Sequence, residues 1–593
     1  MIKFMHVATA VALACTLTAT TVAAQTTPST PTAQSAADQA FTRLADSYFD
    51  TYYFPTNPST ATSQGLHTYD SKLEDYSRAG IDANVKALQQ WETRVSAVDP
   101  ASLGDFVRGD RELVLNNIHS TLLTLQRIRP WQKNPDSYSS GITSSAFSLM
   151  ERKFAPPEVR LRALIAREQQ MPAALAEARK NLDNPPKIYT QIALEQLPGL
   201  VHFFQNDVPS AFIDVTDATL KKQFTDSNAA VIKALQDYQT WLQGDVLPRS
   251  HGDFRIGTAA FRDKLKYDEM VSLPLDQLIA IDMANMRQNQ QAFADVAKQL
   301  DPGKTPRQVL GELASDYPPP DKILDTFRDT FSHLIAFINQ KQIITIPSDV
   351  RPIVEETPPF MRATTFASMD TPGPYETVAK EAYFNVTLPE AGWSKQRTQE
   401  FMAQFSYPVI STIATHEAYP GHYIQFLWMH YLDDRVRKLL GANTDVEGWA
   451  HYCEQMMLDE GLAQFEFPND KHQQLLLRLG QLQDALLRNA RFIVGIKLHT
   501  GEMTMDQAID FFVKEGYQSR AVGEVETKRG TSDPTYLYYT LGKLQIMKLR
   551  ADLAAKQGKD FNLMQFHNAF MQQGFAPIKI VRQAMLHDSS PTL

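Results

Sequence analysis

The sequence predicts a mainly α-helical protein, with one large multi-helix domain and a small β-sheet or hairpin near residues 343–386. Only 26 of the 593 residues are glycine, whereas the helix-forming residues Leu, Ala, Gln, Lys and Glu are abundant. Apolar residues also recur at helical spacing in several long segments. With 43% hydrophobic and 21% charged residues, the composition excludes a collagen-like chain, a disordered chain and a disulfide scaffold.

The first 24 residues have the pattern of a secretory signal peptide. Lys3 precedes an apolar run from about Val7 to Leu17, and Val22-Ala23-Ala24 supplies small residues for cleavage. The run is shorter than the roughly 20 residues that a membrane-spanning helix needs. We therefore predict a signal peptide over 1–24, a flexible polar leader over 25–36 and a single large helical domain over 37–593, in a periplasmic or secreted protein.

Several other classes of protein are disfavoured. A lipoprotein attached through Cys15 fits less well, because Ala12 stands where a larger aliphatic residue is usual. No later stretch of 18 apolar residues occurs, so we expect no stable insertion in a membrane. The chain has 58 basic and 67 acidic residues and no long basic run, which argues against nucleic acid as a partner. The sequence does not indicate the oligomeric state.

Helical patterns follow one another along the chain, and we expect their apolar stripes to form the core. Within the predicted helix over 159–182, Pro172 predicts a kink or a break. The predicted helices cover 159–182, 229–247, 275–300, 475–498, 505–515 and 536–556. Region 343–386 differs from them because it is rich in Ile, Val, Thr, Phe and Pro, which predicts a few short strands.

Chemistry-bearing residues gather in the last third of the chain, and we place the catalytic part at about 340–593. Thr415 is followed by the string His-Glu-Ala-Tyr-Pro-Gly-His, which ends at His422. Zinc peptidases commonly hold the metal with two histidines and use a glutamate beside the first one as general base. His416, His422 and Glu417 have the residue types for these roles.

The spacing of the two histidines does not suit a regular helix. His416 and His422 are six residues apart, which puts them about 120° apart around a helix axis. Between them lie Pro420, which lacks the N–H of a helical residue, and Gly421, which permits unusual dihedral angles. We therefore predict a broken helix that realigns both imidazoles onto one metal ion.

A second segment supplies further candidates. Glu447, His451 and Glu454 share one helical face at i, i+4 and i+7. Glu447 best suits a third metal ligand, with His451 or Glu454 orienting a ligand from behind. The alternative is that these histidines and glutamates are exposed or hydrogen-bonded residues of ordinary amphipathic helices.

The sequence resembles the large bacterial family known as domain of unknown function 885. Its most specific strings are HEAYPGHYIQ at residues 416–425 and EGWAHYCE at residues 447–454. PTYLYYTLGK at 534–543 and FRIGTAAFRDKL at 254–265 also match. The resemblance implies a helical metallopeptidase-like fold, distantly similar to the carboxypeptidase Taq and oligopeptidase groups. At the matching positions of this sequence, the resemblance implies one zinc ion bound by His416, His422 and Glu447, with Glu417 as general base.

We therefore expect a zinc metallopeptidase, a hydrolase that cleaves short peptides or a small amide with metal-activated water. A tyrosine hydroxyl would stabilise the oxyanion, with Tyr539 as first candidate and Tyr536 and Tyr538 behind it. Arg529 and Lys543 could neutralise a substrate carboxylate. Manganese or cobalt could replace zinc.

Three other functions stay open at this point. One is a non-catalytic periplasmic protein that binds a metal or a peptide, and another is hydrolysis of a non-peptide amide or ester by the same site. The third is a helical interaction scaffold in which the histidines are structural.

Overall fold

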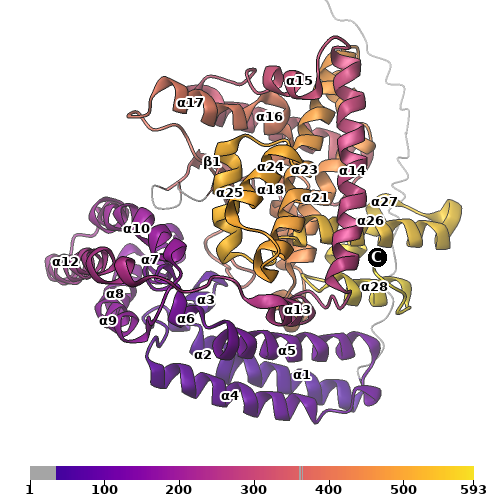
Figure 1. Cartoon of the computed structure of the whole chain (residues 1–593). Helices are drawn as coiled ribbons and strands as arrows, with labels where there is room; N and C mark the ends of the chain where they lie inside the picture. The colour runs from indigo at the N-terminus through magenta and orange to yellow at the C-terminus, as the bar shows by residue number, and fades with distance from the viewer. Residues whose placement is uncertain (1–34, 359–361, 363–364) are drawn as a thin grey trace, which may run out of the picture.

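The computed structural model describes residues 35–358, 362 and 365–593 and confirms the predicted mainly helical fold (Figure 1). The predicted signal peptide, 1–24, and most of the predicted leader lie outside the described residues. The first helix begins at Ala36, where the Ser35 side chain accepts a hydrogen bond from the backbone N–H of Asp38. Among the described residues no helix is long and apolar enough to cross a membrane.

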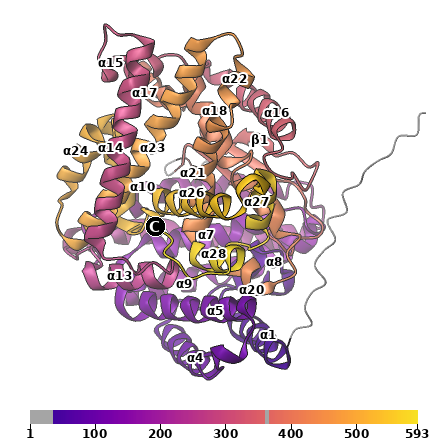
Figure 2. The same ribbon diagram turned by 90° about the vertical axis from the view of Figure 1, so that its right-hand side faces the viewer.

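The N-terminal helices form a layer along one side of the molecule (Figure 1). They are α1 (Ala36–Tyr48), α2 (Phe54–Thr56), α3 (Pro58–Ser63), α4 (Arg78–Ser96), α5 (Asp105–Leu123) and α6 (Pro130–Lys133). Their apolar side chains, Phe41 and Trp91 among them, share one core with C-terminal residues such as Trp449 and Phe570. Figure 2 shows the C-terminal helix α28 lying over α5, so the two ends of the described chain pack together.

The next helices form a bundle with a second core of its own, seen at the left of Figure 1. They are α7 (Asp136–Glu151), α8 (Pro157–Glu168), α9 (Met171–Asn181), α10 (Lys187–His202), α11 (Val208–Ala211) and α12 (Ala218–Trp241). The predicted helix over 159–182 is broken into α8 and α9, and Pro172 lies in the first turn of α9. Proline suits that place because the first N–H groups of a helix have no partner within the helix.

The remaining helices surround the sequence strings noted above. They are α13 (Gly257–Asp268), α14 (Leu275–Leu300), α15 (Pro306–Leu313), α16 (Ile323–Lys341), α17 (Lys395–Met402), α18 (Tyr407–Glu417), α19 (His422–Met429), α20 (Arg435–Leu439), α21 (Asn443–Asp459), α22 (Leu462–Glu466), α23 (Lys471–Thr500), α24 (Met505–Lys514), α25 (Arg520–Ser532), α26 (Tyr538–Gln557), α27 (Leu563–Met571) and α28 (Ile578–Leu586). Short π-helical and 3₁₀ turns extend or link several helices.

The predicted small sheet is present within 343–386 and has three strands in the order β1-β3-β2. These are β1 (Ile353–Glu356), β2 (Ala367–Asp370) and β3 (Tyr383–Val386). β1 runs parallel to β3, and β2 runs antiparallel to it. Phe384 of β3 packs on Phe327 and Phe331 of α16, with ring centroids 4.8 and 5.1 Å apart. Phe331 in turn contacts Tyr419, so the sheet and α16 support the segment between α18 and α19.

Candidate metal centre

The helix that carries the first histidine is broken, as predicted. α18 ends at Glu417 and α19 begins at His422. The Tyr419–Pro420 peptide bond between them is cis. A β-carbon added at Gly421 would collide with the backbone carbonyl of His416. Only glycine fits at this close approach, which lets the chain turn back so that both imidazoles lie side by side, with ring centroids 4.9 Å apart.

Side chains from two helices fix this turn in place. The indole N–H of Trp449 on α21 donates to the carbonyl oxygen of Pro420 at 2.9 Å. On α19, the Gln425 amide donates to Asp445 Oδ1 of α21 at 2.7 Å. Both bonds are buried, so they hold α19 and the turn against α21. The strings around His416 and Glu447 thus contain the residues that lock their relative position.

His416, His422 and Glu447 converge on one point. The Nε2 atoms of both histidines lie 3.3 Å from Oε2 of Glu447, and the three ligand atoms all lie within 4.8 Å of one another. Two atoms that bind zinc tetrahedrally at about 2.0–2.1 Å are about 3.3–3.4 Å apart. Glu447 Oε2 and His422 Nδ1 are buried and have no hydrogen-bond partner among the described residues. The donor set and its spacing therefore fit a zinc ion.

Glu454 organises the centre from behind. Its carboxylate oxygens lie 2.7 Å from His416 Nδ1, 3.0 Å from His451 Nδ1 and 3.2 Å from the Arg488 guanidinium. A carboxylate at Nδ1 of His416 favours a proton on that nitrogen, so that in the neutral imidazole the lone pair of Nε2 would face Glu447. Both residues are buried: Glu454 contacts the predicted ligand His416 directly, whereas His451 contacts Glu454.

The site shifts the pKa values of its own groups. Burial lowers the pKa of His416, but the carboxylates of Glu447 and Glu454 outweigh burial and raise it to about 9. Burial raises the pKa of Glu447, yet the two histidines outweigh it and hold that pKa well below its usual value. Burial lowers the pKa of His451 to about 3, which keeps this imidazole neutral. Burial also raises the pKa of Glu417, which makes it a stronger base.

A close crossing of α21 and α26 brings Tyr539 to the centre. At this crossing Gly448 faces Gly542, and a β-carbon added at either would collide with the other helix. Tyr539, in the first turn of α26, lies with its ring centroid 6.1 Å from that of His416, the planes 25° apart. The glycine next to Glu447 and the glycine three residues after Tyr539 thus explain how these two side chains meet.

The other candidates divide into two groups. Arg529 donates to the Tyr539 hydroxyl at 3.0 Å, and Tyr538 donates to Asp533 at 2.8 Å, so both lie beside the centre. Tyr536 is fully buried and packs in the core, with its hydroxyl against Gly530. Lys543 is fully buried as well, and its Nζ has no hydrogen-bond partner among the described residues, so its contact with a substrate carboxylate stays a prediction.

Sequence reasoning missed three charged residues of α23. Asp484, Arg488 and Arg491 follow one another at i, i+4 and i+7 inside the apolar segment 475–498. Arg488 contacts Glu454 and Asp484, and Arg491 forms a bidentate pair with Glu526 at 2.7 and 2.8 Å. Charged residues on one face of an otherwise apolar helix are the signal that could have revealed them, since buried charges need partners.

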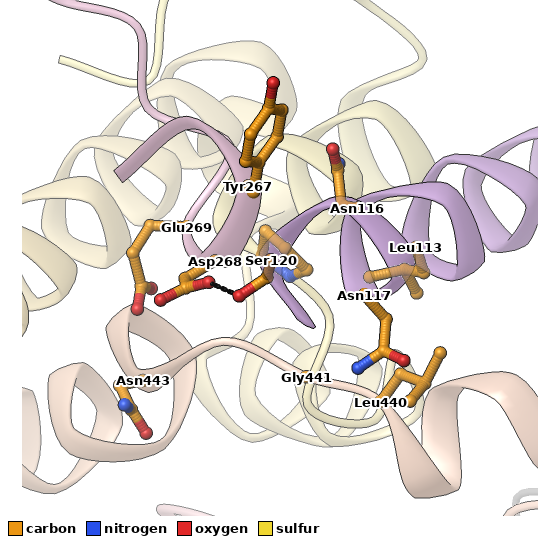
Figure 3. A pocket seen from close by; sticks show the side chains of 11 residues that line it. Leu113, Asn116, Asn117, Ser120, Tyr267, Asp268, Glu269, Leu440, Gly441 and Asn443 are labelled. Carbon is orange, nitrogen blue, oxygen red and sulfur yellow. Dashed lines mark hydrogen bonds between the residues drawn. The ribbon is translucent and has the colours of Figure 1, made fainter. Parts of the chain in front are cut away.

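A separate pocket of about 150 Å³ lies at the N-terminal end of α21, between α5, α13 and the segment that follows α20 (Figure 3). Asn117, Ser120 and Asp268 line it, and Ser120 donates to Asp268. Glu269, also in its wall, accepts a hydrogen bond from the backbone N–H of Thr444 at 2.8 Å and so caps α21. The pocket shares no residue with the cluster of His416, His422 and Glu447.

Comparisons with known proteins bear on the fold and the family of this chain. A structure from Shewanella oneidensis, of a protein of unknown function described as a proposed lipoprotein, is 28% identical with a TM-score of 0.75 and covers 92% of this chain and 99% of its own. A structure from Colwellia psychrerythraea, also described as a proposed lipoprotein, is 18% identical with a TM-score of 0.76. The match covers 93% of this chain and 99% of the other, and it shows that the two share a fold. No curated protein matches the chain. The model of the family described as "Bacterial protein of unknown function (DUF885)" matches residues 58–585, and the chain therefore belongs to this family.

Proposed function

We propose that this protein is an exported zinc-dependent hydrolase that acts on short peptides. The observation that carries the proposal is the convergence of His416, His422 and Glu447 at zinc-ligand spacing, with Glu417 directly after the first histidine. The buried Oε2 of Glu447 faces both imidazole Nε2 atoms at 3.3 Å but has no hydrogen bond of good geometry among the described residues. A bound cation would satisfy it.

In this proposal the three ligands hold the metal and Glu417 moves the proton. A zinc ion bound there would polarise a substrate carbonyl and make water a better nucleophile at neutral pH. Glu417 forms no hydrogen bond within the described residues, and burial raises its pKa. Its carboxylate is therefore free to accept a proton from the attacking water and to deliver it to the leaving amine, which lets the scissile C–N bond break.

Tyr539 would stabilise the negative charge that develops on the carbonyl oxygen. Burial, together with the nearby Glu447 carboxylate, raises the pKa of Tyr539 to about 12, so its hydroxyl stays protonated. The oxygen of this hydroxyl accepts a hydrogen bond from Arg529, which leaves its own hydrogen available for the substrate. A donor fixed in this way costs no reorganisation during the reaction.

We also propose that the protein is exported. The signal-like pattern over 1–24 and two similar proteins described as proposed lipoproteins support this. The N-terminus of the mature protein distinguishes the two routes of export. Cleavage before Gln25 gives a free secreted or periplasmic protein, whereas a lipid-modified Cys15 at the first position gives an anchored one. Mass spectrometry of the protein from its native host distinguishes these forms from an uncleaved chain, which would contradict export.

The test of catalysis combines metal analysis with a peptide digest. The purified mature protein should contain one zinc ion per chain and cleave members of a mixed-peptide panel, read by mass spectrometry. The variant Glu417→Gln should keep the metal and lose roughly 10²- to 10⁴-fold in rate. Metal without cleavage would favour a binding protein, and cleavage of esters or non-peptide amides alone would change the substrate class. Full activity of the variant would refute the role of Glu417.

A further inference from the structure

Three guanidinium groups surround the ring of Tyr539. The central carbons of Arg488, Arg491 and Arg529 lie 5.8, 4.8 and 5.8 Å from its centroid. Catalysis as proposed above needs Tyr539 as a donor, but it does not require three cations around one aromatic ring. Cation–π attraction to a single ring does not by itself account for three cations around it, so the charges need another explanation.

Two of the three cations are already neutralised. Arg491 forms its bidentate pair with Glu526, and Arg488 lies between the carboxylates of Glu454 and Asp484. Their side chains are only 9% and 11% exposed. Arg488 and Arg491 are therefore parts of the buried scaffold behind the candidate metal centre.

Arg529 differs from both in pairing and in exposure. Its one ion-pair partner among the described residues is Asp533 at 3.5 Å, and the same oxygen of Asp533 accepts the Tyr538 hydroxyl at 2.8 Å. Glu526 also acts on its charge but is already held in the bidentate pair with Arg491. The Arg529 side chain is 37% exposed. Its Nε and Nη1 atoms form no hydrogen bond in the described part of the chain, so they remain available to an incoming group.

We infer that Arg529 forms a carboxylate-recognition subsite beside Tyr539, so that the enzyme prefers substrates with a carboxylate close to the scissile bond. The inference rests on the function proposed above. Arg529 donates to the Tyr539 hydroxyl, which would contact the scissile carbonyl oxygen of the substrate. Its free N–H groups would therefore lie close to the substrate groups on either side of that carbonyl. A planar guanidinium with free N–H groups is the best match for a carboxylate.

Two substrate groups could supply this carboxylate. In a peptide whose last bond is cut, the terminal carboxylate lies three covalent bonds from the scissile carbonyl carbon, through the amide nitrogen and the α-carbon. The side chain of a substrate Asp or Glu after the cut is the other source. The chemistry recognised by Arg529 is the same for both, and peptides can distinguish them.

The experiment compares three short peptides that differ only at the end. One ends in a neutral residue with a free carboxylate, one ends in amidated Glu and one ends in amidated Gln. The zinc-loaded enzyme should have a kcat/KM roughly 10- to 100-fold higher for one or both of the first two than for the third. Preference for the first peptide alone identifies the terminal carboxylate, and preference for the second identifies the side chain.

Variants at two neighbouring positions test the assignment. Arg529→Gln should bring the ratio of acid to neutral peptide close to one, and Arg529→Lys should restore part of it, because the charge returns without the planar fork. Lys528→Gln is the matched control, since Lys528 lies on the same helix, is 38% exposed and pairs with the distant Glu195. It should keep the wild-type ratio. An unchanged ratio in Arg529→Gln, or equal rates for the three peptides, would overturn the inference.

A binding measurement separates this inference from the proposed hydrolysis. In the Glu417→Gln variant, calorimetry should show tighter binding of the acid peptides, again by roughly 10- to 100-fold, and the double variant with Arg529→Gln should lose the difference. If the protein cleaves no peptide yet shows this difference, the proposed reaction fails and the subsite stands. If it cleaves peptides without the difference, the subsite fails and the reaction stands.

Discussion

Two histidine–carboxylate clusters of this molecule have similar composition and different geometry. In the first, which we name the closed cluster, His67 lies between Asp70 and Glu376, with Nδ1 3.1 Å from one carboxylate and Nε2 2.9 Å from the other. In the second, the open cluster of His416, His422 and Glu447, one carboxylate oxygen faces two imidazole nitrogens at an equal 3.3 Å.

The difference shows how the same residue types serve two purposes. In the closed cluster each ring nitrogen has its own carboxylate, so a protonated His67 satisfies every partner and joins segments 309 residues apart. In the open cluster Nδ1 of His416 is already used by Glu454, and the remaining groups point to one shared position. The closed cluster is therefore a pair of ion pairs that connects two distant segments, and the open cluster has the arrangement of ligands around a cation.

The largest expected difference between the clusters is in metal content. If the open cluster holds zinc as proposed, His422→Ala should lose it, because two ligands remain where a catalytic zinc site usually has three. His67→Gln should keep the wild-type amount, because its cluster leaves no nitrogen free. Elemental analysis after dialysis measures both. Equal metal content in wild type and His422→Ala would mean that the open cluster does not bind the ion.

A substitution in the turn should break the open cluster without touching a ligand. In Gly421→Ala the added methyl group would collide with the His416 carbonyl, so the turn must shift and separate the two imidazoles. We expect a loss of about 1–3 kcal/mol in the free energy of unfolding and a loss of zinc. Gly311→Ala, on helix α15 with open space around it, is the control. Wild-type zinc affinity in Gly421→Ala would show that the close approach does not hold the ligands.

Removing a charge behind the open cluster should have a smaller effect. Glu454→Gln keeps an acceptor for His416 but loses the charge that orients the imidazole and pairs with Arg488. Metal affinity should fall by about 10- to 100-fold, as for other residues that support a ligand. Glu376→Gln makes the same change in the closed cluster and should leave metal affinity unchanged. Competition with a chelator gives the two affinities, and matching values would remove the distinction between the clusters.

Much of the fold was readable from local periodicity. The predicted helix over 275–300 coincides with α14, and the strands fall within the predicted 343–386 region. The predicted break near Pro172 is present, because α8 ends at Glu168 and proline has no N–H to bond to that residue's carbonyl. Periodicity reports which face of a helix is apolar, whereas helix ends depend on capping and packing, and the helix predicted over 229–247 begins at Ala218, after the cap Asp217.

The site was readable where its residues lie in short strings. His416, His422, Glu447 and their supporting residues occupy two such strings, so spacing and chemistry predicted their grouping. Arg488 was missed because its partner Glu454 lies 34 residues before it on another helix. Tyr536 and Tyr539 could not be distinguished, because three residues in one tyrosine-rich turn differ only in which helix each one faces. Such assignments depend on the crossing of α21 and α26 at Gly448 and Gly542.

The smallest expected effect is a pH dependence of stability that belongs to the closed cluster. Burial lowers the pKa of His67, but the hydrogen bonds to Asp70 and Glu376 outweigh it and raise the pKa above the usual 6.5. Since the folded protein holds this proton more tightly than the unfolded chain, the stabilisation is complete below about pH 6.5. It is lost as the pH rises through the folded-state value. For a partly exposed ion pair the contribution is about 1 kcal/mol or less.

This effect can be separated from every other titration by a difference measurement. Urea denaturation of wild type and His67→Gln at pH 6 and pH 8 gives four free energies of unfolding. The advantage of wild type should be larger at pH 6 than at pH 8, because protonated His67 pairs with both carboxylates only at the lower pH. Titration of the open cluster is common to both proteins and cancels. An advantage that does not change with pH would mean that His67 joins its segments as a neutral hydrogen-bonding group.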